Sequence, residues 1–464
     1  MDIRPEPTSV CLPPEQPVGT PANLTALFLL LAAGLMIGTI LNHKEPVYGA
    51  NDASRWNTVY YLVEHGTYEY LPKHGAWWGH PDPTLPRQIP PFATIDMIRI
   101  PDAQGGDRYY SSKPPLLPTV LAGVVLLIEK LSLGHADFRQ NPWFIIRTTL
   151  ILVQVVPLLA AFWLIRRDVL RGRDTPFAHA FSLAAIALGT YLTAYAVTLN
   201  NHVIAAATGM FAAHAMIRIW YDERRGRHWY AITGFFGAFT AAVELPAGLL
   251  LAGLFLLMLI RDWRRTLIAA LPAALLPTVV ALYTNYLVTG SIWPAYTEVF
   301  KPGGWYDFPG SYWSQPSGID AAQESKLAYL THMLIGHHGF FSLTPILLIC
   351  LLGMIREMMR PADGRRCLAS VTLLLTAVVA AVYVYTTNNY GGLCEGFRWL
   401  FWVVPLWLLF VAEGADLLGR NRLGRLVCYA FLAVSVLSMA DALPRPWAQS
   451  WLHRLFLQYQ WVNY

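Results

Sequence analysis

Long uninterrupted apolar blocks constrain this chain more than any other feature of its sequence. Three of them, Leu24–Leu41, Trp143–Ile165 and Thr266–Leu287, carry at most one charged residue each. Each is long enough to cross a hydrocarbon core of about 30 Å, which takes about 20 helical residues. The composition agrees, because 55% of the 464 residues are hydrophobic and only 14% are charged, whereas soluble domains have about 25% charged residues. We therefore expect an all-α integral membrane protein.

The segment before the first apolar block differs from a cleavable signal peptide. Arg4 is its only basic residue, and no small-residue cleavage site follows the block, although signal peptides combine both features. We therefore expect residues 1–23 to form a cytoplasmic segment in front of a transmembrane domain at residues 24–443.

The net charge of +5 is modest, and the basic residues lie between apolar blocks rather than in one stripe. This pattern indicates membrane topology and argues against a nucleic-acid partner. The five cysteines have no repeated spacing, so we expect neither a disulfide framework nor a cysteine zinc motif.

Short basic clusters between the apolar blocks predict the topology. They lie at residues 166–173, 224–227, 261–265, 356–366 and 420–425. Short loops rich in Lys and Arg stay in the cytoplasm, so an even number of crossings must separate neighbouring clusters. Together with the apolar lengths, this rule predicts about 11 transmembrane helices, with the N-terminus inside and the C-terminus outside.

The apolar segment Pro114–Leu131 decides that count. If it crossed fully with the N-terminus inside, every basic cluster would face outward, against the charge rule. We therefore interpret it as a re-entrant or interfacial helix on the outer side. The alternative is a full crossing with the N-terminus outside, which would divide the residues of the first loop between the two sides.

This topology predicts three periplasmic parts. The first is a long loop at 42–142 that contains juxtamembrane helices, and it escapes the charge rule because it exceeds about 60 residues. The second is a loop at 288–340. The third is an interfacial tail at 444–464, rich in aromatic residues that are typical of membrane interfaces.

The first loop begins with Asn51-Asp52-Ala-Ser-Arg55-Trp56. Residues 53–65 have a helical pattern, so Asp52 is expected at or near an N-cap, where it would stabilise the helix by about 1 kcal/mol. The alternative interpretation is a carboxylate at the membrane surface that faces an acceptor hydroxyl. Position alone does not decide between them.

The same loop ends in a lysine, Lys113, that precedes a Pro-Pro pair and an apolar helix. This position holds the amine at the level of the lipid headgroups. It either extends to phospholipid in general or binds the phosphate of one particular lipid.

Three further sites could be structural or functional. Asn200-Asn201-His202 lies at the tip between two predicted spans, as a simple turn or as part of a substrate site. Glu244 lies at the turn of an otherwise apolar hairpin, where an ionisable group is either solvated or functional. His337-His338 would need a third ligand to hold a metal, and the sequence does not place one, so we expect no metal site.

The order of these motifs resembles the polyprenyl-phosphate-sugar glycosyltransferases of the GT-C fold. Asn51-Asp52-x-x-Arg55, a Gly-Thr-Tyr turn at 66–68 and Tyr-x-x-Lys113-Pro-Pro-Leu116 are similar to motifs of the aminoarabinose transferases and protein O-mannosyltransferases. Arg147 resembles an arginine that follows the Pro-Pro-Leu helix in these families, and the Gly-x-Arg segment that ends at Arg398 resembles another of their motifs. Asn51-Asp52 stands where that group has an Asp-Glu pair.

The resemblance implies an inverting glycosyltransferase that uses a lipid-linked sugar in the bacterial inner membrane, with its active site facing the periplasm. It implies that Asp52 is the catalytic base. The expected partners are membrane lipids, a polyprenyl-phosphate-linked sugar, and a glycan, lipid or protein acceptor. No nucleotide or other cofactor is expected. Residues expected to bind the donor phosphate or substrate are Arg55, Lys113, Arg147, Arg398, Asn201, His202 and Glu244.

Two other classes of function remain open. A secondary transporter or flippase would place charged residues near the membrane midplane and usually carries internal repeats, whereas this chain concentrates polar residues in its outer loops. A non-catalytic subunit of an envelope-assembly complex is the other alternative.

Overall fold

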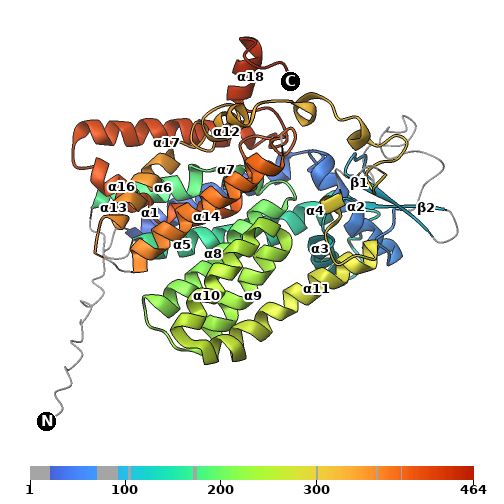
Figure 1. Ribbon diagram of the computed structural model, residues 1–464, viewed down its shortest axis with the longest axis horizontal. Helices are drawn as coiled ribbons and strands as arrows, with labels where there is room; N and C mark the ends of the chain where they lie inside the picture. The colour runs from blue at the N-terminus through green and yellow to red at the C-terminus, as the bar shows by residue number, and fades with distance from the viewer. Residues whose placement is uncertain are drawn as a thin grey trace.

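The computed structural model describes residues 21–70, 92–102, 106–170, 175–298, 301, 303–361, 364–387 and 389–464. Most of the predicted N-terminal segment, residues 1–20, therefore lies outside the described part. The described part consists mainly of helices, with one pair of short strands (Figure 1).

The first half contains nine helices and both strands. They are α1 (Pro21–Asn42), α2 (Ala50–His65), β1 (Met97–Pro101), β2 (Asp107–Ser111), α3 (Leu116–Leu131), α4 (Pro142–Leu150), α5 (Val156–Val169), α6 (Pro176–Leu188), α7 (Tyr191–Tyr195), α8 (Asn201–Trp220) and α9 (Arg227–Val243). A π-helical turn, η1 (Ile151–Val155), joins α4 to α5.

The second half continues with nine more helices. They are α10 (Gly248–Arg265), α11 (Leu271–Thr289), α12 (Lys326–Leu334), α13 (Ile346–Met358), α14 (Gly364–Thr386), α15 (Val404–Leu408), α16 (Val411–Leu418), α17 (Arg422–Ala442) and α18 (Trp451–Gln458). Short 3-10 or π segments are η2 (Leu245–Ala247), η3 (Thr266–Ala270), η4 (Ala295–Glu298), η5 (Tyr312–Ser314), η6 (Gly318–Ala321) and η7 (Arg398–Val403).

Helical segments lie at each predicted span. They are α1, α4–α5, α6, α8, α9, α10, α11, α13, α14, η7–α16 and α17. Within the described residues, seven helices are long and apolar enough to cross a membrane, or up to eight if the bent pair Arg398–Leu408 and Val411–Leu418 is one span. The protein is thus an all-α, multi-pass membrane protein, and the number of 11 crossings stays a prediction.

The continuous run Leu245–Thr289 contains two of the predicted spans. Asp262 has non-helical φ and ψ of −161° and 93° near the end of α10. Both α10 and α11 pack against α9, so the chain reverses direction between them (Figure 1). A helix reversal, rather than a polar loop, separates these two spans.

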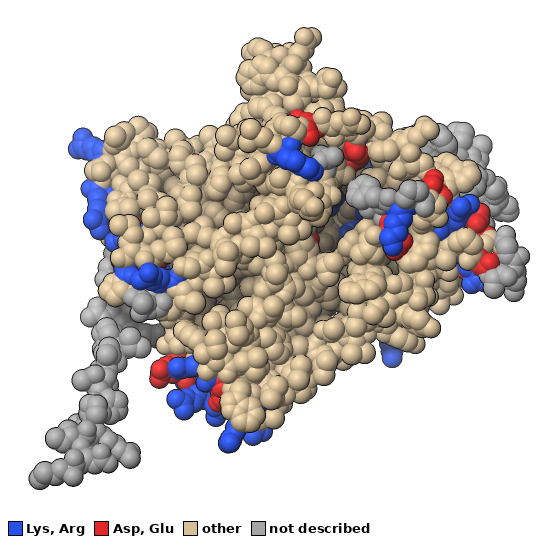
Figure 2. Space-filling view, in the orientation of Figure 1, with Lys and Arg blue, Asp and Glu red and all other residues tan. Residues whose placement is uncertain are grey.

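The described members of the basic clusters meet at one end of the bundle. Arg261 pairs with Glu223, which directly precedes the 224–227 cluster, at 3.0 Å, and Arg356 pairs with Asp416 at 2.9 Å. The Thr175 hydroxyl also donates to Asp416, at 3.1 Å. Figure 2 shows Lys and Arg gathered along the left and lower-left edges of the molecule. This arrangement fits an even number of crossings between clusters, and the assignment of this end to the cytoplasm stays a prediction.

The opposite end carries α2, the strand pair and α3. The strands are antiparallel, with Met97 opposite Ser111, and the sequence prediction missed them because five-residue strands inside a long loop give a weak pattern. Helix α3 lies along α2. Just after α3, the Phe138 ring packs edge-on against Trp56 and Tyr60 of α2. Whether α3 re-enters the membrane stays a prediction.

Helix α8 is the central helix of the bundle. Almost all of its residues are buried, and α5, α9 and η7 surround it. Asn200 caps its N-terminus by accepting the Val203 N–H at 2.9 Å. This packing fixes the first turn of α8 next to α2 and η7.

Candidate functional site

Asp52 lies in the first turn of α2, with no exposed surface. The helix starts at Ala50, three residues earlier than predicted, so Gly49 is the N-cap and Asp52 is the third helical residue. Burial raises the pKa of Asp52 to about 6, although its hydrogen bonds lower it. A carboxylate with this pKa is poised to exchange a proton near neutral pH.

All four lone-pair positions of the Asp52 carboxylate accept hydrogen bonds. Oδ1 accepts the N–H groups of Gly49 at 2.8 Å and Ala53 at 3.0 Å. Oδ2 accepts the Tyr48 N–H and the Thr198 hydroxyl, both at 2.8 Å. A carboxylate has about four such positions. Asp52 thus caps the helix, as one interpretation predicted, and Thr198 is its only side-chain donor among the described residues.

A chain of hydrogen bonds connects α2 to α8 and to the turn after α9. Arg55 Nη2 donates to Asn201 Oδ1 at 2.6 Å, and Asn201 Nδ2 donates to Glu244 Oε2 at 2.7 Å. The same Glu244 oxygen lies 2.7 Å from His202 Nδ1. The adjacent pair Asn201 and His202 and the more distant Glu244, all predicted site residues, therefore converge with Arg55.

Arg398 completes this chain from the other side. Its Nη1 lies 2.9 Å from His202 Nε2, so the guanidinium donates there and His202 donates from Nδ1 to Glu244. Its Nε and Nη2 donate to the Gly391 carbonyl at 3.1 and 2.6 Å. Gly391 has a φ of 92°, and a Cβ there would collide with Arg398. A glycine is needed at this point for the turn to hold the arginine.

Lys113 is also buried and forms an ion pair with Asp96 at 2.9 Å. Burial lowers the pKa of Lys113, and so do the positive charges of Arg55 and Arg398, whereas Asp96 raises it. Burial and Arg398 likewise lower the pKa of Arg55, to about 10. The three cations are therefore close enough to repel one another.

Two of these cations lack a direct counter-ion. Arg55 and Arg398 are 3% and 9% exposed. Of the carboxylates in the described part of the chain, none lies within 4.0 Å of either guanidinium. Their hydrogen-bond acceptors are the neutral groups of Asn51, Asn201, Gly391 and His202. Buried charge without a direct ion-pair partner is costly, so an anion placed beside these two guanidinium groups would be stabilised.

Arg147 does not join the cluster through its hydrogen bonds. Its guanidinium donates to the carbonyls of Ile40, His43 and Lys44 at 3.3, 2.7 and 3.1 Å. These carbonyls lie at and after the end of α1, where helices leave acceptors unsatisfied. The structure therefore shows a helix-capping role, and its predicted role in donor binding stays a prediction.

Sequence reasoning missed three members of the site. Asp96 is the ion-pair partner of Lys113, and Thr198 is the side-chain donor to Asp52. Trp447, which the tail supplies, donates from Nε1 to the Thr198 hydroxyl at 3.0 Å. Its ring lies 5.0 Å from the Arg398 guanidinium carbon. Thr198 carried a signal, because it lies two residues before the Asn200 tip, and Trp447 belongs to the aromatic tail whose residues the sequence predicts at the membrane interface or against a sugar.

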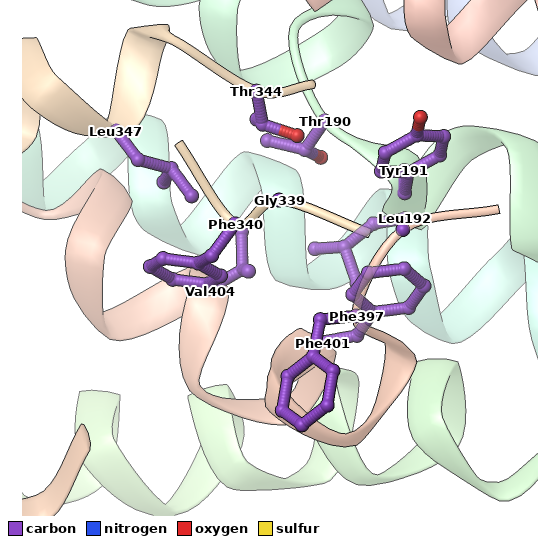
Figure 3. Close-up of a pocket in the computed structure, with 11 residues that line it drawn as sticks. Thr190, Tyr191, Leu192, Gly339, Phe340, Thr344, Leu347, Phe397, Phe401 and Val404 are labelled. Atoms are coloured by element: carbon purple, nitrogen blue, oxygen red, sulfur yellow. The ribbon is translucent and has the colours of Figure 1, made fainter. Parts of the chain in front are cut away.

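A separate, mainly apolar pocket is lined by residues from α7, from the segment between α12 and α13, and from the segment around η7 (Figure 3). Four of its eleven lining residues are aromatic, namely Tyr191, Phe340, Phe397 and Phe401. Its other polar groups are the hydroxyls of Thr190 and Thr344. Because no charged side chain lines it, this pocket does not suit a phosphate.

Comparison with known proteins identifies the fold. No protein-family model matches the chain, and no curated protein matches it in sequence. The archaeal oligosaccharyltransferase AglB from Archaeoglobus fulgidus, solved with an inhibitory peptide and a dolichol-phosphate, superposes with a TM-score of 0.51 at 11% identity. The match covers 92% of this chain and 56% of AglB.

ArnT from Cupriavidus metallidurans is a second similar structure. Its apo form gives a TM-score of 0.49 at 13% identity, over 90% of this chain and 64% of ArnT. Its form bound to undecaprenyl phosphate gives 0.49 at 12% identity, over 91% and 64%. The chain thus spans less than two thirds of the length of these proteins. The likeness to AglB, together with the helical architecture, shows that the chain is a multi-pass membrane protein of the GT-C fold.

Proposed function

We propose that this chain is an inverting glycosyltransferase. It moves a sugar from a polyprenyl-phosphate donor to a hydroxyl group of a glycan, lipid or protein. The observation that carries the proposal is the pair of buried arginines, Arg55 and Arg398, that form no direct ion pair with a carboxylate of the described residues and lie beside Lys113. A phosphate neutralises such a cluster and accepts several of its donors. AglB, which shares the fold, was solved with a dolichol-phosphate.

The reaction that this site supports is a single displacement. The acceptor oxygen attacks the anomeric carbon while the bond from that carbon to the phosphate oxygen breaks. The acceptor proton passes to Asp52, and the phosphate leaves as polyprenyl phosphate, held by Arg55, Lys113 and Arg398. Because one displacement occurs, the anomeric configuration inverts.

Asp52 reaches the acceptor through Oδ2 in this proposal. That oxygen becomes free when the Thr198 hydroxyl turns away and an acceptor hydroxyl donates in its place. Asn201, His202 and Glu244 then act as positioning residues, since they connect the two arginines through short hydrogen bonds. We place the protein in the bacterial inner membrane, with this site facing the periplasm.

Binding of the lipid phosphate tests the proposal. Native mass spectrometry of the purified full chain in detergent should detect undecaprenyl phosphate bound at least tenfold more tightly than undecaprenol, which has no phosphate. Arg398→Gln removes a guanidinium group with its positive charge and its N–H donors. The variant should bind undecaprenyl phosphate about tenfold or more weakly, because hydrogen bonds to charged groups contribute about 1.5–3 kcal/mol.

Arg356→Gln is the matched control, because Arg356 is a half-buried arginine at the opposite end of the bundle. It should leave binding unchanged. Equal binding of undecaprenol, or equal binding by the Arg398→Gln variant, would contradict the proposal.

A further inference from the structure

Three buried histidines come together beside the site without taking part in it. His337 and His338 lie between α12 and α13, and His453 lies in the first turn of α18. One ligand nitrogen from each lies within 4.8 Å of those of the other two. The sequence showed only the adjacent pair, since the third histidine follows more than 100 residues later.

The hydrogen bonds of these rings leave lone pairs that face each other. His337 Nδ1 and His338 Nδ1 are 2.6 Å apart, and a single proton can lie between them. His453 Nε2 donates to the Tyr464 carbonyl at 3.0 Å, which leaves its Nδ1 as the acceptor nitrogen. That buried Nδ1 has no hydrogen-bond partner among the described residues. Such a buried orphan is rare in folded proteins and calls for an explanation.

We propose that His337, His338 and His453 bind a divalent cation of the zinc class. Three neutral imidazoles suit Zn²⁺, which binds nitrogen at about 2.0–2.1 Å in tetrahedral geometry. Ligand nitrogens in such a site are about 3.4 Å apart, so small ring rotations bring these three into place. Burial lowers the pKa of all three rings, and the neutral imidazole is the form that binds metal.

A carboxylate and a tyrosine hydroxyl lie next to the ring nitrogen of His337 that would not bind the cation. Glu324 accepts the Tyr464 hydroxyl at 2.6 Å, and that hydroxyl lies 3.1 Å from His337 Nε2. Ligating histidines commonly donate their second nitrogen to a group of this kind, which fixes the ring. The fourth position of the cation is left for water.

The cation would hold the tail against the loop that supports Arg398. His338 stacks on the Tyr390 ring with centroids 4.8 Å apart, and Gly391, the next residue, accepts from Arg398. The Ser450 hydroxyl donates to the His337 carbonyl at 2.8 Å, so α18 already docks here. This role is structural, and the proposal does not depend on the glycosyltransferase assignment.

Metal content tests the proposal. The full chain is purified in detergent through a tag without histidines, incubated with zinc chloride, desalted, and analysed by inductively coupled plasma mass spectrometry. We expect about one zinc per chain. His453→Gln and His338→Gln should each lower the retained zinc at least tenfold, and zinc should raise the Tm of the unsubstituted chain but not the Tm of these two variants.

His214→Gln is the matched control, because His214 is a buried histidine that hydrogen-bonds to Asp168 at the far end of α8. It should retain zinc. An unsubstituted chain that retains no zinc would overturn the proposal. So would His338→Gln and His453→Gln variants that elute as monodisperse protein and retain as much zinc as the His214→Gln variant.

Discussion

The protonation of Asp52 sets the expected pH dependence of the reaction. Burial raises the pKa of this carboxyl to about 6. Below that value the carboxyl is protonated and cannot accept a proton from the acceptor hydroxyl, whereas above it the base is available. The transfer rate should therefore fall about tenfold for each pH unit below about 6 and reach a plateau above it.

Thr198 gives a way to move that midpoint. Its hydroxyl donates to Asp52 and so lowers the pKa of the carboxyl. Thr198→Val removes this donor, and the midpoint of the pH–rate profile should shift to higher pH. The measurement is the rate of sugar transfer at limiting acceptor concentration in isolated membranes across about pH 4.5 to 8, because this rate reports the pKa of the enzyme before the acceptor displaces Thr198. A profile whose midpoint is the same in both proteins would show that Asp52 does not control the rate.

The contact between α13 and α16 depends on two glycines. A Cβ at Gly353 would collide with the Phe410 carbonyl, and a Cβ at Gly414 would collide with the Ile349 carbonyl. Small residues of this kind let membrane helices approach closely.

Gly353→Ala should therefore lower the free energy of unfolding by about 1–3 kcal/mol, because backbone rather than a flexible side chain must move. Thermal unfolding in detergent measures the change. Gly34→Ala on α1 is the control, since no atom outside its own helix lies within 4 Å of the added Cβ. Equal stability of the two variants would refute the close helix contact.

The helices could be predicted from the sequence, but their connections only in part. Apolar length located the long helices, and the Pro-Pro pair before Leu116 located the start of α3 to within two residues. The span predicted from Phe341 starts as a helix only at Ile346, because an apolar pattern does not distinguish a buried loop from a helix. The strand pair was missed for the reason given above.

Site residues could be predicted from the sequence where a polar residue lies directly next to a predicted span, as Asp52 does after the first one. Most of its partners could not, because most of these contacts join segments far apart in the chain. Lys113 and Asp96 are close in sequence, but Trp447 reaches Thr198 across 249 residues. Aromatic residues in the tail gave the pattern of a membrane interface, and only the fold shows that one of them covers the site.

The position of the two ends relative to the membrane determines which compartment the site faces. In a background without the five native cysteines, Asp107→Cys lies at the α2 end, and Arg420→Cys lies among the basic clusters. A membrane-impermeant maleimide added to intact cells with a permeable outer membrane should label Asp107→Cys alone. Arg420→Cys should react only after the inner membrane is opened. Labelling of Arg420→Cys alone in intact cells would invert the topology.

The most direct test of the central claim is the sugar content of the cell envelope. Mass spectrometry would compare glycans, lipids and glycoproteins from cells that lack the gene, cells that carry it, and cells that carry Asp52→Asn. The account predicts that one species loses the mass of a single sugar when the gene is absent or carries Asp52→Asn, while the Asp52→Asn protein still binds undecaprenyl phosphate. Identical envelope profiles in all three strains would contradict it.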